Sequence, residues 1–273
     1  MVMSPESPAI LPILRALVEE HSGLHYGAAD RVLFFDRVST RAAEAGFTSL
    51  HDYYYFLRYD PRAASELTAL TEALVVNESY FFRELRTLQL IVKHFLTPVV
   101  RAGLRPRVWS AACATGEEPL TLAMLLAQEG LLGDVDIIAS DISGRVLERA
   151  RSGRFPARSV RAGFDAELAR SWLKQDGQTW FVDESLVNAV HWQRVNLHRP
   201  AEVAAVGLSD VVLCRNVFIY FSEKTVSRVL RSVADSLRPQ GALFIGVSES
   251  VLRLGTFFTC EERDGVFFYR RAA

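Results

Sequence analysis

The feature that most constrains the fold of this chain is a regular alternation of short apolar strands and amphipathic helices that begins after Pro106. The predicted order is strand, helix, strand, helix, and then, nearer the C-terminus, strand, helix, strand, strand, over residues 107–111, 117–128, 135–140, 144–151, 210–214, 223–237, 242–247 and 265–270. Strands that are joined by helices usually run parallel. The pattern therefore predicts an open, doubly wound α/β sheet.

The residues before this alternation predict helices instead. Apolar residues recur at helical spacing in two stretches, Leu33, Phe34, Val38 and Ala42, and then Leu67, Leu70 and Leu74. We therefore expect an all-helical N-terminal domain over residues 1–84, a linker helix over 85–106 and the α/β domain over 107–273. A hairpin signal at Asp176-Gly177, with a further strand over 189–196, indicates a small inserted β-subdomain at about 174–192.

Composition limits the kinds of ligand and partner that the chain is expected to bind. The 273 residues carry 31 Lys and Arg against 32 Asp and Glu, so the whole-chain charge does not attract a polyanion such as nucleic acid. Cys113, Cys214 and Cys260 are spaced for neither a disulfide framework nor a zinc site, and no metal is expected. The N-terminal stretch has no basic leader, and no uncharged apolar run reaches ~18 residues. We expect a cytoplasmic protein that does not insert into a membrane.

The loop that follows the first predicted strand, Ser110–Pro119 (SAACATGEEP), is rich in small residues. Ligands of doubly wound sheets bind beyond the carboxyl ends of the strands, where small residues allow close approach to the backbone. Only Gly116 of the dinucleotide pattern G-x-G-x-x-G is present, and the loop lacks the Lys of a phosphate-binding loop. Glu117 and Glu118 suit a cationic ligand, such as a sulfonium with an amino group, or they merely favour the start of a helix through its dipole. Both interpretations fit this loop alone.

Polar residues also follow two other predicted strands. Asp141 ends the second strand, where it can accept hydrogen bonds from ribose hydroxyls or cap the next helix. Arg215 and Asn216 follow the strand over 210–214, and Tyr220 lies about one helical turn further on. Because parallel strands deliver these residues to the same sheet edge as Gly116, we expect a ligand pocket there.

Six short segments add a more specific signal: residues 77–84 (NESYFFRE), 109–124 (WSAACATGEEPLTLAM), 141–143 (DIS), 195–197 (VNL), 214–221 (CRNVFIYF) and 246–250 (GVSES). In this order they resemble motifs of the chemotaxis receptor glutamate methyltransferases, the CheR family, and the resemblance extends from about Gly23 to Arg270. It implies a class I, Rossmann-like methyltransferase sheet with an antiparallel edge strand and a small inserted β-subdomain, behind a helical receptor-recognition domain. It also implies methyl transfer from S-adenosyl-L-methionine to receptor glutamates in chemotactic adaptation.

The resemblance assigns roles to individual residues. It implies that Glu117 holds the amino-acid end of the cofactor and that Asp141 binds the ribose. It also implies that Arg83, which reaches the cofactor from the domain junction, and Tyr220, near the transferred methyl, are catalytic. The full set of implied cofactor-binding residues is Asn77, Ser79, Arg83, Ala112, Glu117, Asp141, Asn196, Leu197, Arg215 and Asn216. The chain departs from the family at Ala112 and Ser79, where glycine and threonine are usual. Alanine weakens binding if the backbone at residue 112 needs a positive φ.

No general base is expected for this chemistry. A glutamate acceptor, with an ordinary pKa of about 4.3, is already ionised at neutral pH. The site must instead align carboxylate, methyl and sulfur and exclude water. The guanidinium of Arg83 can orient a carboxylate through a fork of donors, although its charge repels a sulfonium. His191 and His198 are interpreted as structural or surface residues.

The partner implied by the resemblance is the acidic cytoplasmic helical domain of a chemotaxis receptor. Arg37 and Arg41 are candidate docking residues, or they belong to a solvated helix face on which Arg41 lies near Glu44. A second basic run either offers another docking surface or is a solvated helix end; it consists of Arg151, Arg154, Arg158 and Arg161. The stretch around Gly177 lacks the G-x-G-like loop of relatives that tether to a receptor C-terminal pentapeptide. We expect a monomer that docks independently of that pentapeptide.

Two other functions are alternatives. A cofactor-binding sensor or scaffold can keep the fold without turnover, since fold does not dictate function. A nucleic-acid methyltransferase is less consistent with the sequence, because the segment Arg215–Tyr220 lacks the prolines of an N-P-P-Y-like turn that stacks an extruded base.

Overall fold

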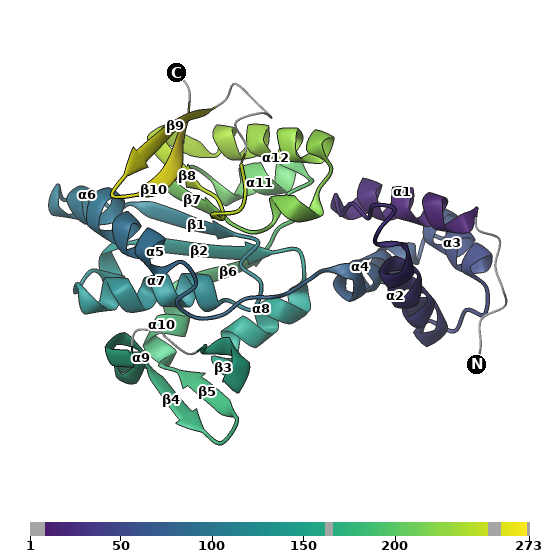
Figure 1. Cartoon of the computed structure of the whole chain (residues 1–273), viewed down its shortest axis with the longest axis horizontal. Helices are drawn as coiled ribbons and strands as arrows, with labels where there is room; N and C mark the ends of the chain where they lie inside the picture. The colour runs from purple at the N-terminus through teal and green to yellow at the C-terminus, as the bar shows by residue number, and fades with distance from the viewer. Residues whose placement is uncertain (1–8, 162–165, 251–257, 272–273) are drawn as a thin grey trace. The chain divides into compact units, whose positions relative to one another are not determined.

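The computed structural model describes residues 9–161, 166–250 and 258–271 of the chain (Figure 1). The chain divides into two compact units. The first extends to Val76 and also contains Tyr220–Thr225, and the second contains Asn77–Ile219 and the residues from Val226 onward. We expected the helical domain to extend to residue 84. Residues 77–84 lie in the second unit instead, because Phe81 and Phe82 are buried in its hydrophobic core.

The first unit is helical over its described residues, as predicted. Its helices are α1 Ile10–Ser22, α2 Arg31–Glu44, α3 Leu50–Tyr59 and α4 Ala63–Leu74. Leu14, Phe34 and Tyr53 are fully buried in their shared core. The segment Tyr220–Thr225 joins these helices through an antiparallel bridge between Leu24 and Phe221. The core of this unit therefore includes a piece of chain from far along the sequence.

A polar network connects α2, α3 and α4. Arg41 donates hydrogen bonds of 2.7 Å to both carboxylate oxygens of Glu66, and the Tyr53 hydroxyl donates to Glu66 Oε1 at 2.6 Å. Burial alone would raise the pKa of Glu66, but the hydrogen bonds from Arg41 and Tyr53 lower that pKa overall. Arg41 also pairs with the exposed Glu44 at 3.2 Å, one turn away on α2. Glu66 is thus the ionised centre of a network that links three helices.

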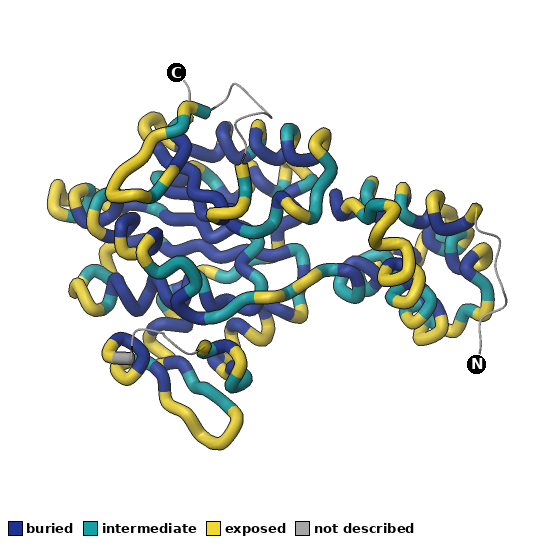
Figure 2. Tube along the Cα trace, viewed as in Figure 1, coloured by how far each residue is buried: buried dark blue, intermediate teal, exposed yellow. Residues whose placement is uncertain are grey.

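The main sheet of the second unit contains seven strands of the described chain, in the order β6-β2-β1-β7-β8-β10-β9. The strands are β1 Arg107–Ala111, β2 Asp136–Asp141, β6 Val190–Arg194, β7 Ser209–Cys214, β8 Leu237–Phe244, β9 Phe258–Arg263 and β10 Val266–Arg271. Neighbours from β6 to β8 pair in parallel, and β10 pairs antiparallel with both β8 and β9. This is the predicted doubly wound sheet with an antiparallel edge, and its central strands are buried (Figure 2).

Helices cover both faces of this sheet. The described helices after residue 84 are α5 Leu85–Ile91, α6 Thr97–Arg101, α7 Glu117–Gln128, α8 Gly144–Arg151, α9 Ala166–Trp172, α10 Glu184–Asn188, α11 Pro200–Val206 and α12 Glu223–Asp235. In Figure 1, α7 and α8 lie on one side of β1 and β2, and α11 and α12 lie on the other. Within the described residues, no helix combines the length and apolarity that a membrane span requires.

The predicted linker helix over 85–106 forms, but it does not act as a linker. It consists of α5, a π-helical turn at Val92–Leu96, and α6. Leu88 and Leu96 are buried in the core of the second unit. The Phe95 ring contacts the rings of Phe244 and Phe268 edge-on, at centroid distances of 5.3 and 5.1 Å. The helix is therefore an integral part of the α/β unit.

Two strand predictions differ from the structure. β8 begins at Leu237 and so includes residues 238–241, which lie between the helix predicted over 223–237 and the strand predicted over 242–247, and its register against β7 shifts between Ser209 and Val211. β9 was not predicted, because its last residues, 261–263, are charged and exposed and give no apolar alternation.

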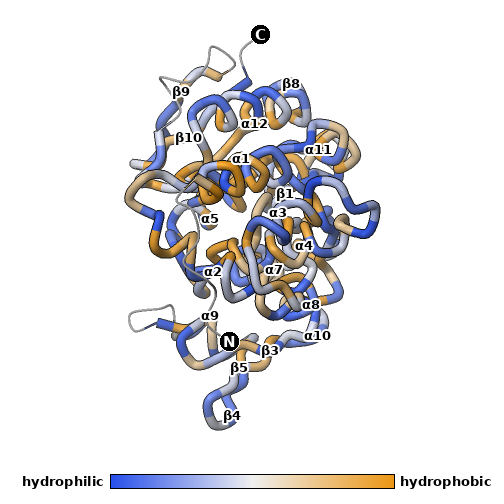
Figure 3. Tube along the Cα trace, turned by 90° about the vertical axis from the view of Figure 1, so that its right-hand side faces the viewer, coloured by the Kyte–Doolittle hydropathy of each residue, from blue (hydrophilic) through white to orange (hydrophobic). Residues whose placement is uncertain are grey.

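The inserted β-subdomain is a separate sheet whose described strands have the order β3-β5-β4. These strands are β3 Arg154–Pro156, β4 Leu173–Asp176 and β5 Thr179–Val182. The sheet thus starts before the predicted range of about 174–192, and the strand expected over 189–196 is β6 of the main sheet. β4 is largely hydrophilic (Figure 3).

Replacing Glu66 by Gln is expected to lower the stability of the first unit by about 1–2 kcal/mol at neutral pH, because charged hydrogen bonds to Arg41 and Tyr53 are weakened. The folded-state pKa of Glu66 lies below its ordinary value of 4.5. The extra stability is therefore present above that pH and is lost as the pH falls through the folded-state pKa. Denaturant unfolding of both proteins between about pH 3 and pH 8 measures the difference.

The matched control is Glu44→Gln, which removes the exposed partner of the same Arg41 guanidinium. We expect it to change the free energy of unfolding by less than about 0.5 kcal/mol. Two results would contradict the assignment of Glu66 as the ionised centre of the network. One is an equal loss of unfolding free energy in the two variants, and the other is a Glu66→Gln effect that persists unchanged in acid.

Candidate functional site

Four neighbouring strands of the main sheet, β6, β2, β1 and β7, end at one edge of the second unit. They all pair in parallel, and Ala111, the last residue of β1, lies opposite Ser140 of β2 and Cys214 of β7. The loops that carry most of the predicted cofactor residues therefore leave the sheet side by side. This edge is the candidate site.

The loop between β1 and α7 turns tightly through three residues with positive φ. The values are 57° at Ala112, 49° at Ala114 and 94° at Gly116. A Cβ atom at Gly116 would lie 2.7 Å from the Ala150 Cβ and 2.9 Å from the Trp192 ring, so only glycine fits between the loop and its neighbours. The sequence raised the question of whether the backbone at residue 112 needs a positive φ. It does, because Ala112 has a left-handed conformation. Alanine is strained at this position.

Asp141 ends β2 and is almost completely buried beside this loop. Its two carboxylate oxygens accept hydrogen bonds from the backbone N–H of Ala114 at 2.9 Å and of Ser143 at 3.0 Å. Burial raises the pKa of Asp141, and these backbone hydrogen bonds oppose the rise. Each carboxylate oxygen can accept a further hydrogen bond from a ligand hydroxyl. The structure thus places Asp141 where the ribose interaction was predicted, and that interaction remains a prediction.

Glu117 begins α7 and is only 1% exposed. Its carboxylate oxygens accept hydrogen bonds from the hydroxyls of Thr115 at 2.6 Å and Ser159 at 2.9 Å. Both of these donors are neutral, so the carboxylate is available to pair with a cationic group of a ligand. Ser159 follows the short strand β3 and was not predicted, because no local motif marks it.

Asn196 and Leu197 follow β6, next to the end of β2, and both are buried. The side-chain carbonyl of Asn196 accepts a hydrogen bond from the backbone N–H of His198 at 2.9 Å. The backbone N–H of Asn196 donates to Glu202 on α11 at 2.7 Å. These bonds fix Asn196 at the end of the strand, next in sequence to the buried apolar Leu197, which is compatible with the predicted contact with a flat heterocycle.

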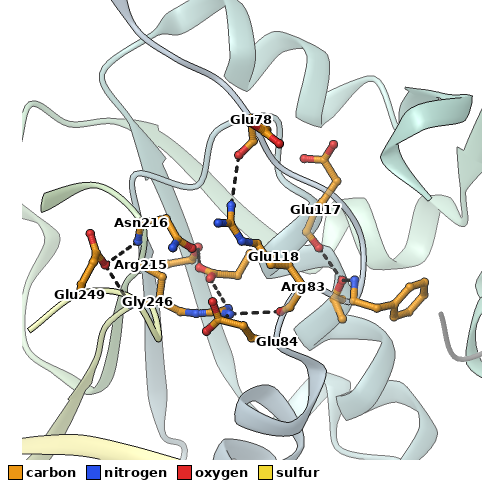
Figure 4. A network of polar contacts seen from close by, with 12 residues as sticks. Glu78, Arg83, Glu84, Glu117, Glu118, Arg215, Asn216, Gly246 and Glu249 are labelled. Carbon is orange, nitrogen blue, oxygen red and sulfur yellow. Dashed lines mark hydrogen bonds and ion pairs between the residues drawn. The ribbon is translucent and has the colours of Figure 1, made fainter. Parts of the chain in front are cut away.

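Asn216 follows β7 in a left-handed conformation, with φ of 57°. Its backbone N–H donates to Glu249 at 2.7 Å, and the same carboxylate accepts from Phe218 at 2.9 Å and Gly246 at 2.8 Å (Figure 4). A side chain on Gly246 would collide with the Asn216 amide. Glu249 therefore joins the ends of β7 and β8. Glu249 lies in the segment 246–250, which resembles a family motif, but it was not predicted as a site residue.

Arg215 has a structural environment that the sequence did not indicate. Its side chain is 2% exposed, and it lies between the carboxylates of Glu118 at 2.7 Å and Glu84 at 2.8 Å. Nη2 also donates to the backbone carbonyl of Arg83 at 3.1 Å, and Ser110 donates to Glu118 at 2.6 Å (Figure 4). Glu118, which the sequence made a candidate for a cationic ligand, thus pairs with a cation of the protein itself.

The segment 77–84 crosses the second unit beside α7. Phe81 donates its backbone N–H to the Ser159 carbonyl at 2.7 Å, and Phe82 donates to the Thr121 hydroxyl at 3.2 Å. Arg83 Nη1 lies 3.5 Å from the Glu78 carbonyl oxygen, and the guanidinium lies 5.5 Å from the centre of the Tyr80 ring. Asn77 and Ser79 are partly exposed in the same segment. The implied roles of these residues stay predictions.

Three predicted residues belong to the first unit. The Tyr220 carbonyl accepts a hydrogen bond from the backbone N–H of His25 at 2.8 Å. Arg37 Nη1 donates to the Leu74 carbonyl at 2.7 Å, and Arg41 is held by Glu66. Both arginines thus have structural partners within the helical unit. Catalysis by Tyr220 and docking by the arginines remain predictions.

The cysteines near the strand ends do not provide a nucleophile. Burial raises the pKa of the Cys113 and Cys214 thiols well above the ordinary value, and nearby carboxylates raise these pKa values further. Both thiols are therefore protonated at neutral pH. Among the described residues, no His, Cys, Asp and Glu side chains form a group of three or more suited to a metal ion.

Comparison with known proteins identifies the family. Residues 77–266 match a family model described as CheR methyltransferase, SAM binding domain, and residues 11–75 match one described as CheR methyltransferase, all-alpha domain. The chain belongs to the CheR methyltransferase family. The junction between the two matches coincides with the division between the two compact units. All the strand-end residues described above lie in the part that matches the SAM binding domain.

Relatives of this CheR-family chain align along most of their length. Chemotaxis protein methyltransferase 2 of Vibrio cholerae is 34% identical over 88% of this chain and 84% of its own. The chemotaxis protein methyltransferase of Klebsiella aerogenes is 33% identical over 93% of this chain and 87% of its own. That of Escherichia coli K12 is 32% identical over 89% of this chain and 85% of its own.

The left-handed alanine of this CheR-family loop yields a direct prediction. Ala112→Gly is expected to raise the free energy of unfolding by about 0.5–1 kcal/mol, because it relieves a left-handed strain of about 1–2 kcal/mol and adds a smaller entropic cost. The control Ala127→Gly lies in α7, where glycine is expected to cost about 0.5–1 kcal/mol. Denaturant unfolding of both variants measures whether each change raises or lowers the free energy of unfolding. Destabilisation by Ala112→Gly would show that its conformation is not a source of strain.

Proposed function

We propose that this chain transfers a methyl group from S-adenosyl-L-methionine to glutamate side chains of chemotaxis receptors, giving glutamate methyl esters and S-adenosyl-L-homocysteine. The observation that carries the proposal is the match of residues 77–266 to the SAM binding domain of the CheR family, because this range contains Glu117, Asp141, Asn196 and Asn216 at adjacent strand ends. The relatives in Vibrio cholerae, Klebsiella aerogenes and Escherichia coli all carry the name chemotaxis protein methyltransferase.

The chemistry of this edge fits S-adenosyl-L-methionine. The buried carboxylate of Glu117 suits the ammonium group of the amino-acid end, and the free acceptor capacity of Asp141 suits two ribose hydroxyls. Asn196 and Leu197 would flank the adenine. The absence of a side chain at Gly116 permits close approach to the backbone.

When bound, S-adenosyl-L-methionine supplies an electrophilic methyl group on a sulfonium. A carboxylate oxygen of the acceptor glutamate would take the methyl group and the thioether would leave, so no residue of this chain would have to accept a proton. The ordinary pKa of a glutamate, about 4.3, keeps the acceptor ionised at neutral pH. The contribution of the protein is therefore alignment and exclusion of water.

Arg83 is the residue of this chain best suited to orient the acceptor. Its guanidinium carries donors in a fork that matches a carboxylate, and its positive charge favours the acceptor side over the sulfonium side. Tyr220 is proposed to line the pocket near the methyl group, as the family resemblance implies. Cys113 and Cys214 are excluded as competing nucleophiles by their raised thiol pKa values.

The test is incubation of the protein with methyl-labelled S-adenosyl-L-methionine and receptor-bearing membranes, followed by alkali. A carboxyl ester releases the label as volatile methanol, whereas an N-methyl group does not. We expect alkali-labile label on the receptor. We also expect a loss of roughly a hundredfold in rate for Arg83→Ala, and little change for Arg86→Ala, an exposed arginine three positions along that donates to the Asp264 carbonyl.

The same experiment separates the alternatives. Alkali-stable label would indicate a different acceptor group. Absence of label on any protein, together with measurable binding of the cofactor, would favour a cofactor-binding sensor of the same fold. Equal rates for Arg83→Ala and Arg86→Ala would remove Arg83 from the catalytic assignment.

The small sheet suggests how the receptor is engaged. β4 and β5 are joined by the two residues Gly177 and Gln178, since Asp176 pairs directly with Thr179. This tight hairpin has no G-x-G-like loop, so we propose that docking does not use a receptor C-terminal pentapeptide. The monomeric state and the cytoplasmic location of the protein also remain our expectations.

Receptors with and without the terminal pentapeptide are expected to be methylated at the same initial rate, within about twofold, at receptor concentrations below saturation. Initial rates measured with paired full-length and truncated receptors check this. A strict requirement for the tail would show that the β4–β5 hairpin, or another surface, binds it.

A further inference from the structure

One arginine connects three parts of the candidate site from inside the protein. Arg215 leaves the end of β7 and reaches Glu118 in the first turn of α7 and Glu84 at the start of α5. It also donates from Nη2 to the Arg83 carbonyl at 3.1 Å. In Figure 4 its guanidinium lies between the two carboxylates and close to the backbone of Arg83. The segment that carries Arg83 is thus tied to the two central strand ends.

The backbone held by this arginine has an unusual conformation. Phe82 and Glu84 both have positive φ, of 66° and 51°, which bulky side chains rarely adopt. Arg83 lies between them. Such conformations persist only where the surroundings hold them in place. Here the hydrogen bond from Phe82 to Thr121 fixes one side of Arg83, and Arg215 fixes the other.

The charge arrangement argues against a simple ligand role for the Arg215 side chain. Its side chain is 2% exposed, and both of its Nη atoms contact protein acceptors. The two carboxylates that flank it are 15% and 16% exposed, so the cation balances acids of the protein itself. Because Nη2 also donates to the Arg83 carbonyl, the same cation contacts the backbone of the residue proposed to orient the substrate.

We propose that Arg215 is a positioning residue: it holds the backbone of Arg83 and Glu84 and thereby sets the direction in which the Arg83 guanidinium meets the acceptor carboxylate. This inference rests on the proposed function for the role of Arg83. It assigns the Arg215 side chain to alignment of the acceptor and not to affinity for S-adenosyl-L-methionine.

Glu84→Gln is the sharpest test, because it keeps the side-chain shape, removes one charge and leaves the Arg215–Glu118 pair balanced. We expect kcat for receptor methylation to fall roughly ten- to a hundredfold through misalignment, with the Kd for S-adenosyl-L-homocysteine changed by less than about twofold. The matched control is Glu129→Gln, the same change at an exposed position directly after α7. It is expected to leave both quantities unchanged.

Hydrogen exchange supplies a readout that does not depend on turnover. A peptide covering residues 80–87 is expected to exchange faster in Glu84→Gln than in the wild type or in Glu129→Gln. If Glu84→Gln does not fold, Arg215→Lys replaces the fork by a single ammonium, which cannot engage both carboxylates and the carbonyl in the same way, and the same pattern is expected.

The outcomes are separable. A rise in the Kd for S-adenosyl-L-homocysteine as large as the fall in kcat would overturn the proposal, since Arg215 would then act on the cofactor site. Unchanged kcat and unchanged exchange would also overturn it. If the wild type places no alkali-labile label on receptors, the proposed function fails, and hydrogen exchange alone decides: faster exchange supports the positioning role and unchanged exchange overturns it.

Discussion

The parallel pairing of β1 with β2 on one side and with β7 on the other is the constraint on which the candidate site depends. Ala111 lies opposite both Ser140 and Cys214, so three strands end at one level of the sheet. At the end of each of these strands lies a residue with positive φ or a buried acidic side chain. Gly116 packs closely against Ala150 and Trp192, so the loop between β1 and α7 lies against these residues. A ligand at this edge would therefore contact the backbone and the short side chains of this loop.

Charge at this edge is strongly biased toward acids, and the protein satisfies them in different ways. Asp141 and Glu249 accept hydrogen bonds from backbone N–H groups, and Glu117 accepts from hydroxyls. None of these donors cancels a negative charge, whereas Arg215 is a full cation placed between two acids. Apart from Arg215, the groups that contact these acids are neutral donors, an arrangement that is consistent with a cationic ligand and unfavourable for a phosphate.

Local patterns in the sequence predicted much of the α/β unit. β1 and α7 have the predicted bounds, because an apolar strand, a loop of small residues and a helix start follow one another without interruption. What could not be predicted depends on contacts between distant residues. Arg215 and Glu118 are 97 positions apart, and each looked like a ligand residue when read alone. The domain boundary was placed too late for a similar reason, since only tertiary packing shows that Phe81 and Phe82 are core residues of the second unit.

Whether an arginine contacts a neutral group or a carboxylate also determines how strongly it can attract an acidic protein. A guanidinium that donates to a carbonyl or stacks on a ring keeps its charge, whereas one that pairs with a carboxylate is neutralised at long range. Arg41 pairs with Glu66 and Arg161 pairs with Glu78. Arg37 donates to a carbonyl, Arg151 donates to the Trp192 carbonyl, and Arg154 lies over the Phe181 ring. By this criterion Arg37, Arg151 and Arg154 keep a charge that can attract an acidic helix, whereas Arg41 contributes only weakly.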